Sequence, residues 1–311
     1  MIALERPGAG HGPRSPGWRA RARVWLLAAA LAWVAGPALA QGPVRIVDDR
    51  GVALEFGRPP QRIVSLLPSL TEMLCALQAC DRLVGVDRWS DWPDAVRGLP
   101  RLGGIDDVAL EALVRLKPDV VLAARSQRLL ERLEALGLKV VALESDRHAD
   151  VQRSLQVLSA LLGRPDEGTR VWARLQAELD AAAARVPPQL RGRSVYVEIG
   201  SGGYAAGPAS FVGETLTRLG LANAAPSDAG PFPRLNPEFV LRAQPELVIG
   251  SARVVRGMPS RPGWQGLAAL REGRVCALET PAWNALVRPG PRLGEAAGLI
   301  ADCLSRLPAR P

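Results

Sequence analysis

The chain has 311 residues, of which 48% are hydrophobic, and 39 Lys and Arg against 31 Asp and Glu give a formal net charge of +8. This length and hydrophobic content exclude a disordered chain and a small domain held together by disulfides alone. Five arginines and one acid fall within the first 40 residues, and no block of like charge follows. The net charge therefore does not indicate a protein that binds nucleic acid.

Residues 1–40 have the pattern of a signal peptide. An arginine-bearing start precedes an apolar run over 24–35, and Ala38-Leu39-Ala40 follows it. A membrane span needs about 20 apolar residues, so the run is too short to serve as an anchor. We expect cleavage after Ala40 and export to the periplasm.

The rest of the chain repeats itself. Residues 111–122 and 238–249 share one pattern: a short amphipathic helix that ends before proline, then an apolar strand. Further strands are predicted over 62–67, 139–143, 193–199 and 274–278. This alternation predicts an α/β protein with two Rossmann-like lobes and mostly parallel sheets. We expect an N-terminal lobe over 41–163, one connecting helix over 164–188 and a C-terminal lobe over 189–311.

Aromatic and polar side chains follow the predicted strands, at the sheet edge where ligands bind in α/β folds. The ligand-binding candidates are Ser69, Trp89, Trp92, Arg125, Tyr204, Phe232, Trp283, Arg288 and Arg292. A cleft lined with flat rings favours a large, flat, mostly uncharged ligand between the lobes. Alternatively, Trp89 and Trp92 merely cap their lobe. Glu72 and Glu214 stand near predicted helix starts, either as capping and dipole partners or as exposed docking charges.

Four cysteines follow the predicted leader, and export permits disulfides. Cys75 with Cys80, and Cys276 with Cys303, would be local pairs; four buried thiols are the alternative, and the sequence leaves both open. No C-x-x-C motif points to a metal or redox site. His148 is the only histidine after the leader and is expected in a solvated loop. No catalytic set can be assembled, so we predict neither an enzyme nor a bound cofactor or metal.

Several segments of the sequence carry a family resemblance. They are residues 63–72, 83–93 and 116–122 in the first half, and 211–214, 236–238, Trp264 and 288–292 in the second. The chain resembles the periplasmic cobalamin-binding proteins of ABC importers, in the group that also binds ferric siderophores and haem. The resemblance implies a class III periplasmic binding protein fold, with two lobes joined by one long helix, a ligand between them and little hinge motion.

The same resemblance implies roles for particular residues. Trp89, Trp92, Phe232 and Trp283 would contact the corrin, while Glu72 and Glu214 would pair with arginines of a membrane permease. We therefore expect a monomer that delivers a corrinoid to the permease and ATPase complex of an ABC importer. The first alternative is a ferric siderophore or haem, with Arg125, Arg253, Arg288 and Arg292 facing an anionic chelate and Tyr204 as an iron ligand. A more distant alternative is an exported enzyme or sensor module.

Overall fold

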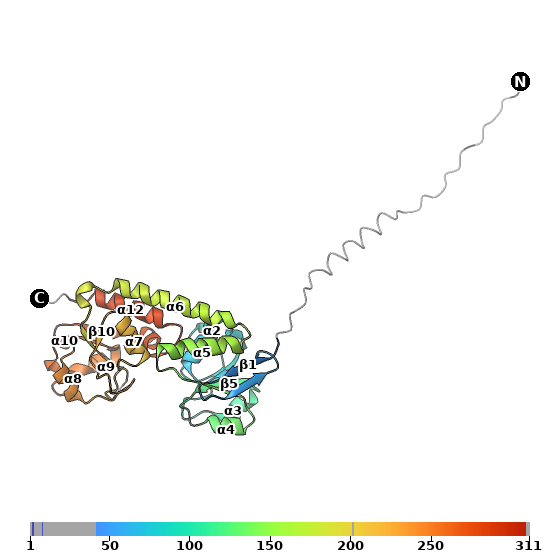
Figure 1. Cartoon of the computed structure of the whole chain (residues 1–311), viewed down its shortest axis with the longest axis horizontal. Coiled ribbons are helices and arrows are strands. Elements are labelled where there is room, and N and C mark those ends of the chain that lie inside the picture. The colour runs from blue at the N-terminus through green and yellow to red at the C-terminus, as the bar shows by residue number, and fades with distance from the viewer. Residues whose placement is uncertain (1, 3–7, 9–41, 201, 309–311) are drawn as a thin grey trace. The chain divides into compact units, whose positions relative to one another are not determined.

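In the computed structural model the described residues are 2, 8, 42–200 and 202–308 (Figure 1). The expected signal peptide lies outside these residues, apart from residues 2 and 8. Residues 42–200 and 202–308 belong to one compact unit. Among the described residues, none of the helices combines the length and the apolar character that a membrane crossing requires.

The first lobe is built on a parallel sheet with the strand order β4-β3-β5-β6. Its strands are β3 (Ile63–Ser65), β4 (Leu83–Val86), β5 (Val120–Ala124) and β6 (Val140–Leu143), and its helices are α2 (Pro68–Ala76), α3 (Leu110–Arg115), α4 (Leu130–Ala135) and α5 (His148–Leu161). The strands are almost entirely buried, as expected of a parallel sheet covered on both faces. We call this part lobe one.

Lobe two repeats the arrangement with the parallel order β10-β9-β7-β8. Its strands are β7 (Ser194–Glu198), β8 (Ala222–Asn223), β9 (Leu247–Ser251) and β10 (Val275–Leu278), and its helices are α7 (Phe211–Arg218), α8 (Pro237–Ala243), α9 (Ala252–Gly257), α10 (Ala268–Arg271), α11 (Thr280–Val287) and α12 (Leu293–Ser305). The predicted α/β class with two parallel sheets is thus confirmed.

Before lobe one lies a hairpin that was not predicted from the sequence. Strands β1 (Val44–Val47) and β2 (Ala53–Phe56) pair antiparallel. Only Ile46 and Phe56 among their residues are fully buried, so the alternation that marks a half-buried strand is weak. The Asp49 carboxylate holds the hairpin to α5 by accepting a hydrogen bond of 2.7 Å from Arg153 Nε.

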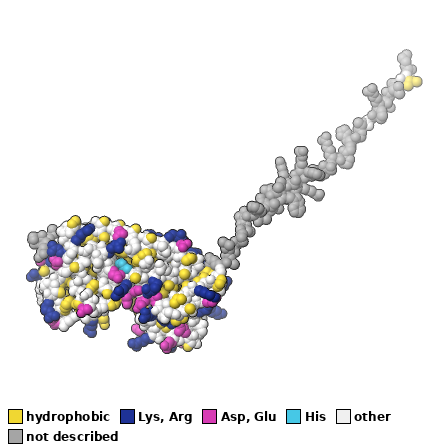
Figure 2. All heavy atoms as spheres, viewed as in Figure 1, with side chains coloured by type: hydrophobic (Ala, Val, Ile, Leu, Met, Phe, Trp, Pro, Cys, Tyr) yellow, Lys and Arg dark blue, Asp and Glu magenta, His cyan; other side chains and the backbone are white. Residues whose placement is uncertain are grey.

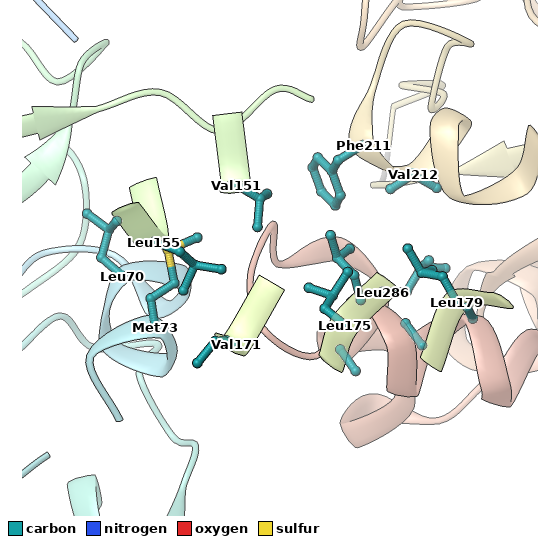
Figure 3. Packing of buried hydrophobic residues seen from close by; sticks show 14 of the residues in the cluster. Leu70, Met73, Val151, Leu155, Val171, Leu175, Leu179, Phe211, Val212 and Leu286 are labelled. Atoms are coloured by element: carbon teal, nitrogen blue, oxygen red, sulfur yellow. The ribbon is translucent and has the colours of Figure 1, made fainter. Parts of the chain in front are cut away.

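The long helix α6 (Pro165–Arg185) connects the lobes where a connecting helix was expected. Proline at its start, acids in its first turn and Arg185 in its last turn suit a helix with these ends. Its buried side chains Val171, Leu175 and Leu179 lie between the cores of the two lobes (Figure 3). On one side they meet residues of α2 and α5, and on the other residues of α7 and α11. Burying each such side chain stabilises the fold by about 1.5–3 kcal/mol. Through α6, one hydrophobic cluster runs across both lobes, while each lobe keeps a second cluster on the other face of its sheet.

Both local cysteine pairs are disulfides in the structure. Cys75 is bonded to Cys80 between α2 and the turn before β4, and Cys276 of β10 is bonded to Cys303 of α12. The described part of the chain contains no free cysteine. The second disulfide joins the edge of the lobe-two sheet to the helix that packs along α6.

Candidate functional site

The loop after β4 presents the two most exposed tryptophans of the described chain. Trp89 is 62% exposed and Trp92 is 43% exposed. Asp87, at the carboxyl end of β4, holds this loop by accepting hydrogen bonds from the Trp89 backbone N at 2.8 Å and from the Ser90 hydroxyl. Asp87 is buried, and this burial raises its pKa. The exposed rings therefore stand on a loop whose base is fixed.

A buried hydroxyl network ties the same loop to the start of α2. The Thr71 hydroxyl donates to Ser65 Oγ at 2.9 Å and lies 2.9 Å from Ser90 Oγ. Arg101 adds donors from the other side, to the backbone oxygens of Ser90 and Asp87. Sequence reasoning missed this support, although an aspartate directly after a strand with a serine three residues later is the pattern of a side-chain-capped turn.

Charged residues of the two lobes meet beside this loop. Arg288, which follows α11, donates from Nη1 to Glu72 Oε1 at 2.8 Å and to Asp91 Oδ1 at 2.7 Å. Arg292 donates from Nε to Glu72 Oε2 at 3.1 Å, and its guanidinium lies 4.8 Å from the centre of the Trp92 ring. We call Glu72, Asp91, Arg288 and Arg292 the interlobe cluster. Burial raises the pKa of Glu72, although the two guanidinium groups act in the opposite direction.

Of the two alternatives for Glu72, the exposed docking charge does not hold in this structure. Glu72 is 2% exposed, because two arginines of lobe two enclose its carboxylate. Ser69, in the same turn of α2, is 3% exposed, and its backbone faces Gly290 of lobe two. Neither side chain offers a free surface in this structure, and the charges of Arg288 and Arg292 are compensated rather than open to an anion.

A second contact between the lobes involves Glu214 and His148. The Glu214 carboxylate accepts a hydrogen bond of 2.6 Å from the backbone N of His148, the first residue of α5. The His148 ring contributes a 2.9 Å hydrogen bond between Nε2 and Thr215 Oγ1. The expectation of a solvated loop was therefore wrong for His148, whose side chain is 17% exposed. Burial lowers the pKa of this histidine.

The remaining predicted ligand residues lie in several places. Tyr204 is 47% exposed. Phe232 is half-buried and packs edge-on against Phe211, with 5.8 Å between ring centres. Trp283 lines a cavity of about 240 Å³ after β9 and β10. Arg125 pairs with Glu144 at 2.8 Å within lobe one. The structure thus brings Trp89 and Trp92 together with Arg288 and Arg292, while Arg125 has a partner of its own.

The arrangement suits the binding of a ligand. Exposed rings can bury a flat ligand by stacking, at about 0.5–1.5 kcal/mol per ring pair beyond the area buried. In the described residues no three histidine, cysteine or acidic side chains are grouped so that they could hold a metal ion. The space-filling view shows an indentation in the surface between the two lobes, below α5 (Figure 2).

Known proteins share this architecture. Residues 63–282 match a family described as periplasmic binding protein. A vitamin B12-binding protein of Pectobacterium atrosepticum is 29% identical over 264 residues, covering 81% of this chain and 91% of its own length. An uncharacterized ABC transporter substrate-binding lipoprotein of Bacillus subtilis, YvrC, is 25% identical and covers 84% of this chain and 85% of its own. The solved apo structure of the periplasmic heme-binding protein RhuT from Roseiflexus is 27% identical, with a TM-score of 0.68 over 78% of this chain and 97% of its own.

Proposed function

Since the chain belongs to the periplasmic binding protein family of ABC transport, whose members bind substrates and are not enzymes, we propose that its cargo is a corrinoid. It is exported, captures the corrinoid between its two lobes and delivers it to an importer. Relatives named as vitamin B12-binding proteins support this cargo, as do the rings of Trp89 and Trp92, which stand exposed at the lobe junction.

The charge balance of the interlobe cluster carries the proposal. Its two guanidinium groups meet two carboxylates, Glu72 and Asp91, within 3.1 Å. An anionic ligand such as haem or a ferric catecholate would need an uncompensated cation, because burying an unpaired charge is costly. A corrin ring whose periphery carries amides needs no such cation. The neutral cluster beside exposed rings therefore favours a corrinoid over an anionic chelate.

Haem or a ferric siderophore is the second candidate. The phenol of Tyr204 is 47% exposed and could reach an iron atom. Arg253, which lines the Trp283 cavity, makes no ion pair within the described residues. The similarity to a heme-binding protein supports the same alternative.

A panel of ligands separates these candidates. The purified protein is incubated with cyanocobalamin, hemin or a ferric hydroxamate and passed over a gel-filtration column, and the visible spectrum of the protein peak is recorded. The proposal expects the corrin spectrum with cyanocobalamin and little colour with the other two. If the protein peak carries only hemin or only the hydroxamate, the cargo is that ligand and not a corrinoid.

The importer itself would recognise a surface shared by both lobes, and we propose that Glu111 and Glu238 form it. They occupy equivalent positions of the repeat, in the first turns of α3 and α8, which lie on the side away from α6 in Figure 1. Both are exposed, and among the described residues neither carboxylate has an ion-pair partner. Glu214, with its side chain 34% exposed, remains a further candidate in lobe two. Glu72 would have to break its ion pairs with Arg288 and Arg292 before it could contact a permease.

Charge reversal tests this surface. In cells whose only corrinoid importer uses this protein, Glu111→Arg with Glu238→Arg should abolish uptake while the purified variant binds cargo as before. Glu131→Arg, at an exposed acid of α4, is the matched control and should transport normally. Normal uptake by the double variant would remove these acids from the docking surface.

A further inference from the structure

A cluster of charged and aromatic side chains lies on the face of the lobe-two sheet that points away from α6. Tyr196 and Glu198 alternate with the residues of β7 that enter the shared core, so both face the opposite side. Arg261 binds the Glu198 carboxylate through both Nη atoms, at 2.6 and 2.7 Å, and the Tyr196 hydroxyl donates to it at 3.0 Å. The Glu198 side chain is fully buried, and its ion pair with Arg261 compensates its charge.

Trp264 completes the cluster and is left with an unused donor. Its ring lies 4.6 Å under the Arg261 guanidinium and meets Tyr196 edge-on, with 5.9 Å between ring centres. Trp264 is 2% exposed, and its buried Nε1 has no hydrogen-bond partner among the residues that the structure describes. A buried donor without an acceptor costs about 1–3 kcal/mol, which an oxygen placed beside it would recover.

A cavity of about 630 Å³ opens directly on this cluster. Tyr196, Arg261 and Trp264 line it, together with Gly202, Gly203 and the segment from Arg234 to Pro237 that leads into α8. Both glycines take positive φ, +119° and +79°, a conformation that side chains disfavour. Because these two residues have no side chains, the backbone itself forms this wall of the cavity. The next residue on the same loop is the exposed Tyr204, a ligand-binding candidate predicted from the sequence.

The charge of the cavity is positive. Arg261 is neutralised by Glu198, whereas Arg234 donates from Nε to the backbone oxygen of Gly202, at 3.1 Å. In the part of the chain that the structure describes, Arg234 makes no ion pair. The cavity is thus lined by one guanidinium without an ion pair and by a ring whose buried indole N–H is unsatisfied, and both groups are donors that suit an oxyanion.

We propose that this cavity is a second binding site that takes a carboxylate or phosphate group, with Arg234 as its charge partner and Trp264 Nε1 as a hydrogen-bond donor. The group belongs either to a free small molecule or to an acidic substituent of the cargo. The site is distinct from the interlobe cluster, whose arginines are already paired with carboxylates.

The indole N–H signals of ¹⁵N-labelled protein test this site. The full chain has 8 tryptophans, and Trp264→Phe identifies the signal of Trp264. Titration with inorganic phosphate and with benzoate should move that signal saturably. Arg234→Gln should weaken the response about tenfold, the effect of one lost charge-assisted hydrogen bond. Arg242→Gln, at an exposed arginine of α8 that does not line the cavity, should respond like the wild type.

The titration tests the second binding site independently of which cargo the protein carries. No saturable shift with either probe, or equal responses of the Arg234 and Arg242 variants, would overturn it. If Trp264→Phe does not fold, sequential assignment identifies the signal in the wild type. A titration of protein preloaded with cyanocobalamin separates the two sources: a blocked response assigns the site to a cargo group, and an unchanged response assigns it to a separate molecule. Failure to bind cyanocobalamin would refute the proposed cargo and leave the phosphate and benzoate result intact.

Discussion

Arg288 of lobe two binds Glu72 of lobe one, with 2.8 Å between Nη1 and Oε1, although 216 residues separate them in the chain. The pair stands beside the loop that carries Trp89 and Trp92, so the same contact that holds the lobes together also borders the candidate ligand site. Together with the core around α6 (Figure 3), it joins the two lobes directly.

Removing the carboxylate of this pair should destabilise the protein strongly. Glu72→Gln leaves Arg288 and Arg292 without their shared anion in a buried place, which costs about 3–5 kcal/mol. Arg45→Gln, in an exposed pair with Glu55 whose side chains are 78% and 55% exposed, should cost less than about 1 kcal/mol. Urea unfolding of both variants measures the difference. Equal losses would show that the interlobe cluster contributes no more than a surface ion pair.

His148 should make stability depend on pH near neutrality. Its pKa is lowered by burial from the usual 6.5 in the folded protein, so the unfolded chain takes up the proton first. As the pH falls below about 6.5, this difference in proton uptake should reduce the free energy of unfolding until the folded form is protonated as well. His148→Gln should lack this component between pH 7 and pH 5. Identical pH profiles of the two proteins in urea unfolding would contradict the prediction.

The two disulfides should differ in their contribution to stability. Cys276–Cys303 closes a loop with a sequence separation of 27, and Cys75–Cys80 one of 5. From loop-closure entropy, the Cys276→Ala/Cys303→Ala variant should lose about 3–4 kcal/mol and the Cys75→Ala/Cys80→Ala variant about 2 kcal/mol. Denaturant unfolding of the two double variants gives both values. A larger loss from the short loop would show that strain or packing, and not chain entropy, dominates.

Trp89 should act on binding and not on folding. Because it is 62% exposed, Trp89→Ala removes little buried area, and the melting temperature should change little. Loss of one stacked ring and its contact area should weaken corrinoid binding about tenfold or more. Leu136→Ala, at an apolar residue of lobe one that is 51% exposed, provides the control and should bind normally. An unchanged affinity of the Trp89 variant would place the cargo elsewhere.

The sheets could be predicted because their strands are short apolar runs with clear ends. The residues of β5 and β9 repeat one pattern in the two halves, and Pro165 and Pro187 delimit α6. Local sequence was sufficient for these elements.

The lobe junction could not be predicted in the same way. Glu72 has the pattern of an ordinary helix-start acid, and its burial depends on Arg288 and Arg292 from the far end of the chain. His148 follows a polar stretch typical of a loop, and it is half-buried because Thr215 and Glu214 of α7 in lobe two contact it. Contacts between segments that are far apart in the chain determine how deeply both side chains are buried. A local sequence pattern carries no information about such contacts.

Calorimetric titration of the purified protein with cyanocobalamin is the sharpest test of corrinoid capture. We expect saturable one-to-one binding that Trp89→Ala weakens, with no comparable heat from hemin. The absence of binding heat with cyanocobalamin, together with tight one-to-one binding of hemin, would show that the cargo is not a corrinoid.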